Sequence, residues 1–151
     1  MKEFNSINDI LEFAMNLEQG AVDFYNGLAN NAKNEEMKEV FSQFAREEMG
    51  HKARLAKIKE QGVFEVSKEK VLDMHIADYM ISAEVTPDIS YADALVVAMK
   101  REKNAYKLYS KLAERAPNDE LKKIFLNLAQ DEAKHKLRFE LEYDEYVLRE
   151  N

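Results

Sequence analysis

The chain has 151 residues, a net charge of −7 and a hydrophobic content of 46%. This length and composition fit one domain that buries its own core, and they exclude a disordered tail. The negative charge and the lack of a lysine- or arginine-rich run argue against a nucleic-acid partner. The absence of cysteine excludes disulfides, thiolate metal sites and cysteine nucleophiles.

Glycine and proline are scarce, with 4 and 2 residues, which favours long uninterrupted helices over sandwiches or barrels. No segment approaches the roughly 20 consecutive apolar residues that a membrane-spanning helix needs. The first residues also lack the apolar stretch of a signal peptide. We therefore expect a cytoplasmic protein with no membrane partner.

The first two predicted helices lie before residue 62. Ser6 and the acidic residue three positions later resemble a capping box, and a helical period of apolar residues follows, which predicts a helix at about 7–31. Asn34 and the two glutamates after it predict the start of a helix at about 35–61, and Gly62 is its natural stop. Because the turn between them is short, the two helices should form an antiparallel hairpin.

The next segment, at about 62–90, is long enough to cross a helical bundle from end to end. Residues from Ser67 to about Ile81 could form a helix within it, which Thr86-Pro87 would break. We expect His75, which also lies in this segment, to be a surface or packing residue.

Two more helices are predicted in the last third of the chain. Ser90, with an aspartate three residues later, forms another capping box and predicts a helix at about 91–115. Pro117 and the residues after it end that helix and start the next one, at about 119–147. The short turn again predicts an antiparallel hairpin.

The two hairpins are repeats of one another. Residues 11–55 and 95–139 align without a gap, 84 positions apart, and 18 of the 45 aligned residues are identical. We therefore predict an all-α, ferritin-like four-helix bundle with one long crossover between the second and third helices. It would be a single domain over 1–151, with repeat 1 at about 7–61 and repeat 2 at about 91–147. A solenoid is the alternative, but solenoids usually need three or more units.

Each repeat carries three ionisable residues in the apolar stripes of its helices. A glutamate lies in the first stripe and a Glu-x-x-His motif in the second, with 33 residues from that glutamate to the histidine in both repeats. The six residues are Glu18, Glu48 and His51 in repeat 1 and Glu102, Glu132 and His135 in repeat 2.

These six residues predict a two-metal site. Four buried carboxylates would repel one another, and two divalent cations would cancel their formal charge. Carboxylate and imidazole ligands suit iron, with manganese as the alternative metal. A single Glu-x-x-His motif is better explained by a core histidine with a helical neighbour, but two motifs in equal register, each with a core glutamate, favour metal binding. A bundle that kept the residues without binding metal is the remaining alternative.

Two acidic residues precede the Glu-x-x-His glutamates and could orient the histidines. We hypothesise that Asp131 accepts a hydrogen bond from His51 and that Glu47 accepts one from His135, which would fix the tautomer of each ring. A solvated charge is the alternative for both.

Tyr25 and Tyr109 lie seven residues after the first glutamate of each repeat, on the same helix face. They could donate hydrogen bonds to the ligands or trap radicals during catalysis. We favour plain core packing for both.

The pattern Glu18…Glu47-Glu48-x-x-His51…Glu102…Asp131-Glu132-x-x-His135 resembles that of the rubrerythrins, a branch of the ferritin-like di-iron carboxylate proteins. The resemblance extends over about residues 6–145. It implies that Glu48 and Glu132 bridge two iron ions and serve catalysis. Glu18 and Glu102 would be terminal ligands, and each histidine would bind one metal.

The resemblance also implies a function. It predicts an oxidoreductase that reduces hydrogen peroxide or O2 at the two irons, and a homodimer. Iron handling with ferroxidase activity and hydroxylation of an organic substrate are the alternatives. The first would need a hollow shell of subunits for storage, and the second would need a pocket beside the metals.

The chain departs from the rubrerythrin pattern in two ways. Rubrerythrins carry a rubredoxin domain, whose iron is held by four cysteines; this chain has no cysteine, so we expect electrons from a separate donor protein. Rubrerythrins also carry an extra glutamate one turn from the third-helix ligand. The candidate positions are Met99 and Ala105, matched by Met15 and Ala21 in repeat 1. This symmetric ligand set is closer to that of bacterioferritin and counts against rubrerythrin-type peroxidase chemistry.

Overall fold

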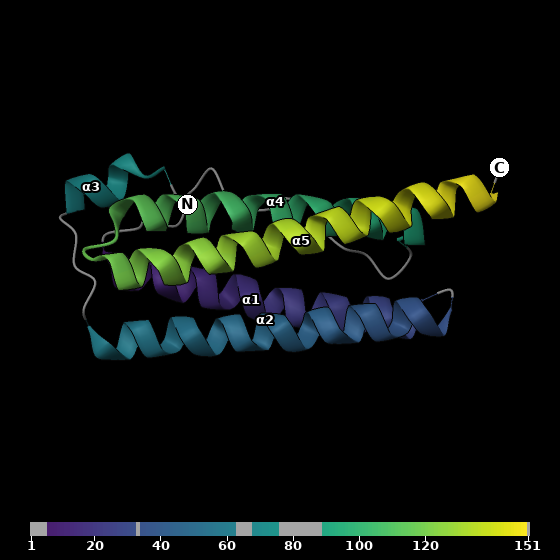
Figure 1. Cartoon of the computed structure of the whole chain (residues 1–151), viewed down its shortest axis with the longest axis horizontal. Coiled ribbons are helices and arrows are strands. Elements are labelled where there is room, and N and C mark those ends of the chain that lie inside the picture. Colours follow the sequence, from purple (N-terminus) through teal and green to yellow (C-terminus); the bar gives the residue numbers. More distant parts are fainter. Residues whose placement is uncertain (1–5, 33, 63–67, 76–88, 151) are drawn as a thin grey trace.

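Four long helices and one short helix make up the computed structural model, which describes residues 6–32, 34–62, 68–75 and 89–150 (Figure 1). The helices are α1 (Ile7–Asn30), α2 (Glu35–Gln61), α3 (Lys68–Asp73), α4 (Tyr91–Arg115) and α5 (Asp119–Glu150). The predicted all-α four-helix bundle is confirmed. None of the described helices is both long enough and apolar enough to cross a membrane.

The helix bounds follow the sequence signals closely. The side chains of Ser6, Asn34, Ser90 and Asn118 each accept a hydrogen bond from the backbone N–H three residues later, at 2.8 to 3.2 Å. Gly62 ends α2 with a φ of 64°, a conformation that glycine adopts without strain. α1 ends one residue before its predicted end, and α5 runs three residues past its own.

The long helices pack as two antiparallel hairpins, α1 with α2 and α4 with α5 (Figure 1). The end of α2 and the start of α4 lie at opposite ends of the bundle, as one long crossover requires. Of the predicted helix from Ser67 to Ile81, the described part is α3, which stops at Asp73. It stops because His75, with a φ of 52°, cannot continue a right-handed helix. Thr86-Pro87 lies outside the described residues.

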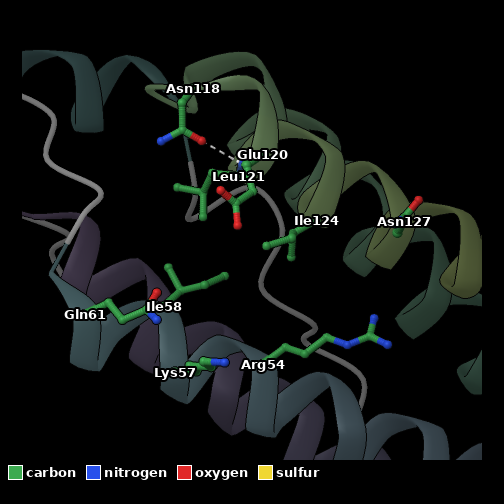
Figure 2. A pocket seen from close by; sticks show the side chains of 9 residues that line it. All are labelled: Arg54, Lys57, Ile58, Gln61, Asn118, Glu120, Leu121, Ile124 and Asn127. Carbon is green, nitrogen blue, oxygen red and sulfur yellow. Dashed lines mark hydrogen bonds between the residues drawn. The ribbon is translucent and has the colours of Figure 1, made fainter.

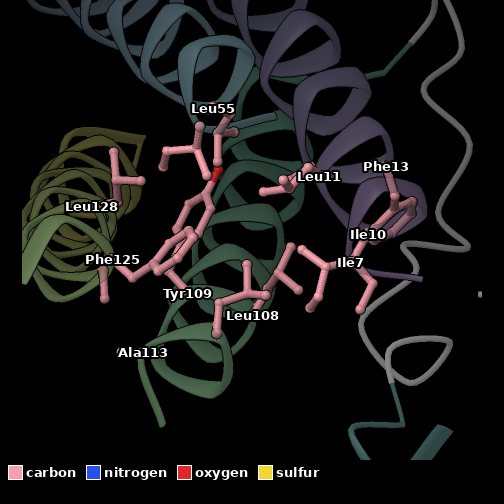
Figure 3. Close-up of a cluster of buried hydrophobic side chains, with 14 of the residues drawn as sticks. Ile7, Ile10, Leu11, Phe13, Leu55, Leu108, Tyr109, Ala113, Phe125 and Leu128 are labelled. Carbon is pink, nitrogen blue, oxygen red and sulfur yellow. The ribbon is translucent and has the colours of Figure 1, made fainter. Parts of the chain in front are cut away.

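The core has two buried clusters, one on each side of the middle of the bundle. We name them after the tyrosine that each contains. The Tyr25 end comprises mainly Val22, Tyr25, Leu28, Met37, Phe41, Leu95, Ala98 and Phe139. The Tyr109 end comprises mainly Ile7, Ile10, Leu11, Leu55, Leu108, Tyr109, Leu112, Phe125 and Leu128 (Figure 3). Val71 and Met74, in and just after α3, add to the Tyr109 end.

Candidate metal centre

The six residues singled out from the sequence meet in the middle of the bundle. Each long helix brings at least one of them, and each is 2% exposed or less. Glu18 comes from α1, Glu48 and His51 from α2, Glu102 from α4, and Glu132 and His135 from α5. In each Glu-x-x-His motif the two side chains are three residues apart, so they project from the same face of their helix.

The six side chains form two overlapping groups. Glu18 and His51 belong to the first group and Glu102 and His135 to the second, while Glu48 and Glu132 belong to both. Within each group, one potential ligand atom per residue lies within 4.8 Å of all the others. If each group held one metal ion, the two shared glutamates would be placed to contact both ions, as bridging carboxylates do.

Each histidine points its Nδ1 atom into the cluster. Nδ1 of His51 lies 2.7 Å from Oε1 of Glu132, and Nδ1 of His135 lies 2.9 Å from Oε1 of Glu48. Neither Nδ1 has a hydrogen-bond partner. Two lone-pair acceptors this close are repulsive unless a proton or a metal ion lies between them.

The opposite ring nitrogen of each histidine points outward. Nε2 of His51 lies 3.1 Å from Oδ2 of Asp131, and Nε2 of His135 lies 3.2 Å from Oε2 of Glu47. The structure thus contains both contacts that we hypothesised from the sequence. If Nε2–H donates to the acid, the lone pair of Nδ1 remains free for a metal ion.

Buried atoms without a hydrogen-bond partner mark the centre. Among the described residues, six of the eight such side-chain atoms belong to the cluster, one from each of the six residues. Buried polar atoms are normally satisfied, because leaving one unpaired costs about 1–3 kcal/mol. The six atoms are therefore placed as ligand atoms would be.

The pKa values of Glu18, Glu48 and Glu132 show how crowded the negative charge is. Burial raises the pKa of Glu48 well above the usual carboxyl value, and the charges of Glu102 and Glu18 raise it further. Burial and the same two neighbours also raise the pKa of Glu132. Burial raises the pKa of Glu18 too, but its close contacts with Glu48 and His51 outweigh it, so that pKa is lowered.

The two histidines hold protons for the same reason. Burial lowers the pKa of His135, but the nearby carboxylates of Glu102 and Glu48 outweigh it and raise this pKa to about 11. Burial likewise opposes the charge on His51, and contacts with Glu18 and Asp131 raise its pKa. Without cations the cluster therefore retains protons, which metal ions would displace on binding.

Two tyrosines connect the repeats across the centre. The hydroxyl of Tyr25 donates a hydrogen bond to Oε1 of Glu102, and the hydroxyl of Tyr109 donates one to Oε1 of Glu18. Both tyrosines are buried, and burial together with the nearby carboxylates raises the pKa of each phenol. The tyrosines therefore hold the terminal glutamates in addition to packing in the core, which our preference for plain packing missed.

A very small cavity lies beside the cluster, between α1 and α4. Its volume is about 20 Å³, and it is lined by Leu17, Glu18, Ala21, Tyr25, Glu48, Arg101, Glu102, Ala105 and Glu132. Of the two candidate positions for an additional glutamate, Ala105 lines this cavity, whereas Met99 packs against the Tyr25 end. A carboxylate at position 105 would project toward the cavity, so the register with Ala105 is the relevant one.

Arg101 is a residue of the centre that the sequence analysis missed. It lines the cavity, its buried Nε atom has no hydrogen-bond partner, and its guanidinium lies 5.1 Å from the ring centre of Phe24. The one sequence feature that could have indicated this role is that Arg101 immediately precedes Glu102. The arginines three residues after the two histidines, Arg54 and Arg138, lie away from the cluster: Arg138 pairs with Glu36 at 3.2 Å.

Arg54 lines a larger groove, of about 460 Å³, between the end of α2 and the start of α5 (Figure 2). The other lining residues are Lys57, Ile58, Gln61, Asn118, Glu120, Leu121, Ile124 and Asn127. None of the six cluster residues lines this groove. It therefore supplies no substrate pocket at the metal centre.

Comparison with known proteins identifies a family model and a solved structure that match the chain. The family model described as rubrerythrin matches residues 9–143. A solved structure described as a ferritin-like diiron-carboxylate protein from Thermotoga maritima has a TM-score of 0.75 and 20% sequence identity to this chain, and covers 97% of this chain and 99% of that one. At that identity the likeness shows the fold alone. No curated protein matches the chain.

Proposed function

This chain belongs to the rubrerythrin family, and from that premise we propose that it is a di-iron oxidoreductase that reduces hydrogen peroxide or O2. Four glutamates and two histidines are the donor set of ferritin-like di-iron proteins. Two divalent ions would cancel the four carboxylate charges, and oxygen and nitrogen donors suit iron, with manganese as the alternative. The six unpaired buried atoms fit this pair of ions.

The proposed role of each ligand follows from the group to which it belongs. Glu48 and Glu132 would bridge the two ions, because both groups share them. Glu18 and His51 would hold one ion, and Glu102 and His135 the other. When bound, a pair of ferrous ions supplies the two electrons that cleavage of an O–O bond needs.

The residues around the ligands would fix their geometry before any oxidant arrives. Asp131 and Glu47 keep each imidazole oriented through its outer nitrogen. Tyr25 and Tyr109 occupy one oxygen of each terminal glutamate, which leaves the other oxygen for a metal ion. The buried apolar ends of the core exclude bulk water from the reaction.

The size of the cavity beside the cluster is the observation that carries this proposal. A volume of about 20 Å³ holds roughly one water-sized molecule. The space beside the four glutamates is therefore too small for an organic substrate, so the cavity favours reduction of a small oxidant over hydroxylation. Arg101 also lines the cavity, and its positive charge would stabilise negative charge on the bound oxidant.

Ferroxidase-type iron handling is the second candidate. The observation that favours it is Ala105, which stands at the register position of the extra rubrerythrin glutamate and leaves a symmetric six-ligand centre. Storage would require a hollow shell of many subunits, so a native mass near that of a dimer would count against it. The homodimer itself stays a prediction, and the same measurement tests it.

A separate donor protein would supply the electrons. None of the 151 residues is a cysteine, so none of them can hold a rubredoxin-type iron. The donor would therefore reduce the centre from outside these residues.

Metal stoichiometry after anaerobic loading with Fe(II) and desalting tests the proposal. We expect about two irons per chain, as in other six-ligand bundles of this type, and faster oxidation of the loaded protein by hydrogen peroxide than by buffer alone. His75→Ala, a change at an exposed residue, is the control and should leave the iron content unchanged. An iron content near zero would contradict the proposal, and rapid oxidation by O2 with release of iron would favour iron handling.

A further inference from the structure

Aromatic rings connect the metal centre to the far part of the Tyr25 end. Phe139 is the junction: its ring centre lies 5.2 Å from that of Tyr25, 5.4 Å from Phe44 and 5.8 Å from Phe41. Phe44 in turn stacks on His135, with the ring centres 4.1 Å apart. Two ligand side chains, Glu102 through Tyr25 and His135 through Phe44, are thus in contact with the same series of rings.

The series continues outward to a pair of tyrosines. The ring centre of Phe41 lies 6.3 Å from that of Tyr91, and Tyr91 lies 5.0 Å from Tyr146. Both tyrosines are partly exposed to solvent. The separations between the phenylalanine and tyrosine rings of the series all fall in the range of ordinary aromatic contacts, about 4.5–7 Å.

A buried carboxylate ends the series. Glu142 is 2% exposed and accepts a hydrogen bond from the hydroxyl of Tyr91 to its Oε2 atom at 2.8 Å. Nη2 of Arg149 lies 3.7 Å from the same oxygen. Burial, and then the hydrogen bond with Glu142, raise the pKa of Tyr91, so its phenol is protonated at rest. The centre described above makes no use of Glu142.

The other repeat shows that packing alone does not demand these residues. Shifting by 84 positions pairs Phe139 with Leu55, Phe44 with Leu128, Tyr91 with Ile7 and Glu142 with Ile58. All four counterparts are aliphatic and lie in the core of the Tyr109 end. Ile7, Leu55 and Leu128 are labelled in Figure 3. At these four equivalent positions, the bundle therefore accommodates aliphatic side chains at one end and aromatic rings and a carboxylate at the other.

We propose that the rings of the Tyr25 end are a route for single electrons, and that Tyr91 and Tyr146 are its outer redox site, with Glu142 as the proton acceptor of Tyr91. This inference rests on the proposed function. The oxidant is the metal pair after it has reacted with a further molecule of hydrogen peroxide, beyond the one that its own two electrons reduce to water. Electronic coupling falls steeply with the gap between π systems, so touching rings carry an electron farther than aliphatic side chains do.

The proposed step balances in electrons and protons. Tyr91 loses one electron, which passes through Phe41 and Phe139 to the oxidised centre and reduces it by one electron. The O–H bond of Tyr91 breaks, and its proton moves along the existing hydrogen bond to Oε2 of Glu142. A neutral tyrosyl radical remains, shared with Tyr146, where a one-electron reductant in solution can restore it. The route would draw surplus oxidising equivalents away from the ligands.

Freeze-quenched electron paramagnetic resonance of the iron-loaded protein after addition of hydrogen peroxide tests this route. We expect a tyrosyl radical whose line shape changes when the protein carries ring-deuterated tyrosine. Tyr91→Phe combined with Tyr146→Phe keeps the rings and should abolish that signal. Glu142→Gln keeps the shape but accepts no proton, and should slow the growth of the signal several-fold.

The interior of the route has a matched control. Phe139→Leu copies Leu55 and should reduce the radical yield several-fold, whereas Phe125→Leu, at the counterpart of Phe41, should leave it unchanged. If Phe139→Leu fails to fold, the variant with both outer tyrosines replaced still decides the question. A radical that persists in that variant, or equal yields from Phe139→Leu and Phe125→Leu, would overturn the route.

Iron content and peroxide consumption, measured on the same samples, separate the two proposals. Normal iron and normal consumption without a radical at Tyr91 or Tyr146 would overturn the route and leave the proposed function standing. Failure to bind iron, or to consume peroxide, would overturn both.

Discussion

The Tyr25 end and the Tyr109 end of the core flank one symmetric centre and yet differ in chemistry. Both ends keep the tyrosine that donates to a terminal glutamate of the other repeat. Beyond that tyrosine, Phe44, Phe139 and Tyr91 at one end have aliphatic counterparts at the other, namely Leu128, Leu55 and Ile7. This difference shows that the metal ligands and the core side chains are subject to different constraints. A pair of metal ions needs the same donors twice, whereas a core needs only apolar volume.

The largest expected effect comes from the glutamates that both ends share. Glu48→Ala and Glu132→Ala should each abolish paired metal binding and lower the iron content from about two per chain to one or fewer, because each group loses a ligand. Metal analysis after desalting measures this. The two variants should lose equal amounts of iron. A clear inequality would mean that the centre is not symmetric.

Packing should respond equally at the two ends. Phe41 and Phe125 are counterparts in the repeats, and both are fully buried. Phe41→Ala and Phe125→Ala should each lower the free energy of unfolding by about 3–5 kcal/mol, through lost burial and the cavity left behind. Urea unfolding of the metal-free protein measures the change. If only one variant were destabilised, the ends would differ in packing and not only in redox chemistry.

A change of pH should act on both ends in the same direction. The pKa of Glu48, Glu132, His51 and His135 is raised in the folded protein, so these groups bind protons more tightly there than in the unfolded chain. Their stabilising contribution is complete below the unfolded pKa values and is lost as pH rises through the folded ones. Glu18 has the opposite sign, but its lowered pKa confines its effect to acidic pH.

The metal-free protein should therefore melt at a lower temperature as pH rises from about 5 to about 9, a window that begins above the unfolded carboxyl pKa. Differential scanning calorimetry measures this. The iron-loaded protein is the control, since its cations replace the protons and metal binding strengthens with pH. A melting temperature that rises with pH in the metal-free protein would contradict the raised pKa values.

The smallest effect concerns the helix caps, which are alike at the two ends. Ser6 caps α1 at the Tyr109 end, and Ser90 caps α4 at the Tyr25 end. Ser6→Ala and Ser90→Ala should each lower the free energy of unfolding by about 1 kcal/mol. Chemical denaturation measures both changes, and Ser→Gly at each position, which should cost only a few tenths, is the control. If the two Ser→Ala variants lost different amounts of unfolding free energy, packing at the two ends of the core would influence the stability of the caps.

Much of the centre could be predicted because pairs of its ligands lie close together in the sequence, within single helices. Glu-x-x-His places two ligands on one helix face whatever surrounds the helix. Because the motif occurs in both repeats, each time 33 residues from a core glutamate to the histidine, all six residues could be identified from the sequence. The hypothesised contacts of Asp131 with His51 and of Glu47 with His135 followed from the same twofold relation. The helix in the connecting segment ends at Asp73, earlier than predicted, and no neighbouring residue had indicated the positive φ of His75.

The sequence by itself determined the four long helices, their caps, the repeat and the six residues of the cluster, since each depends on spacing along a single helix. Only the tertiary structure decided which tyrosine meets which glutamate, that Ala105 and Arg101 line a cavity of about 20 Å³, and that Glu142 is buried against Tyr91. These features depend on the distance and rotation between helices far apart in the sequence. The packing of all the side chains together sets both, so no local pattern encodes them.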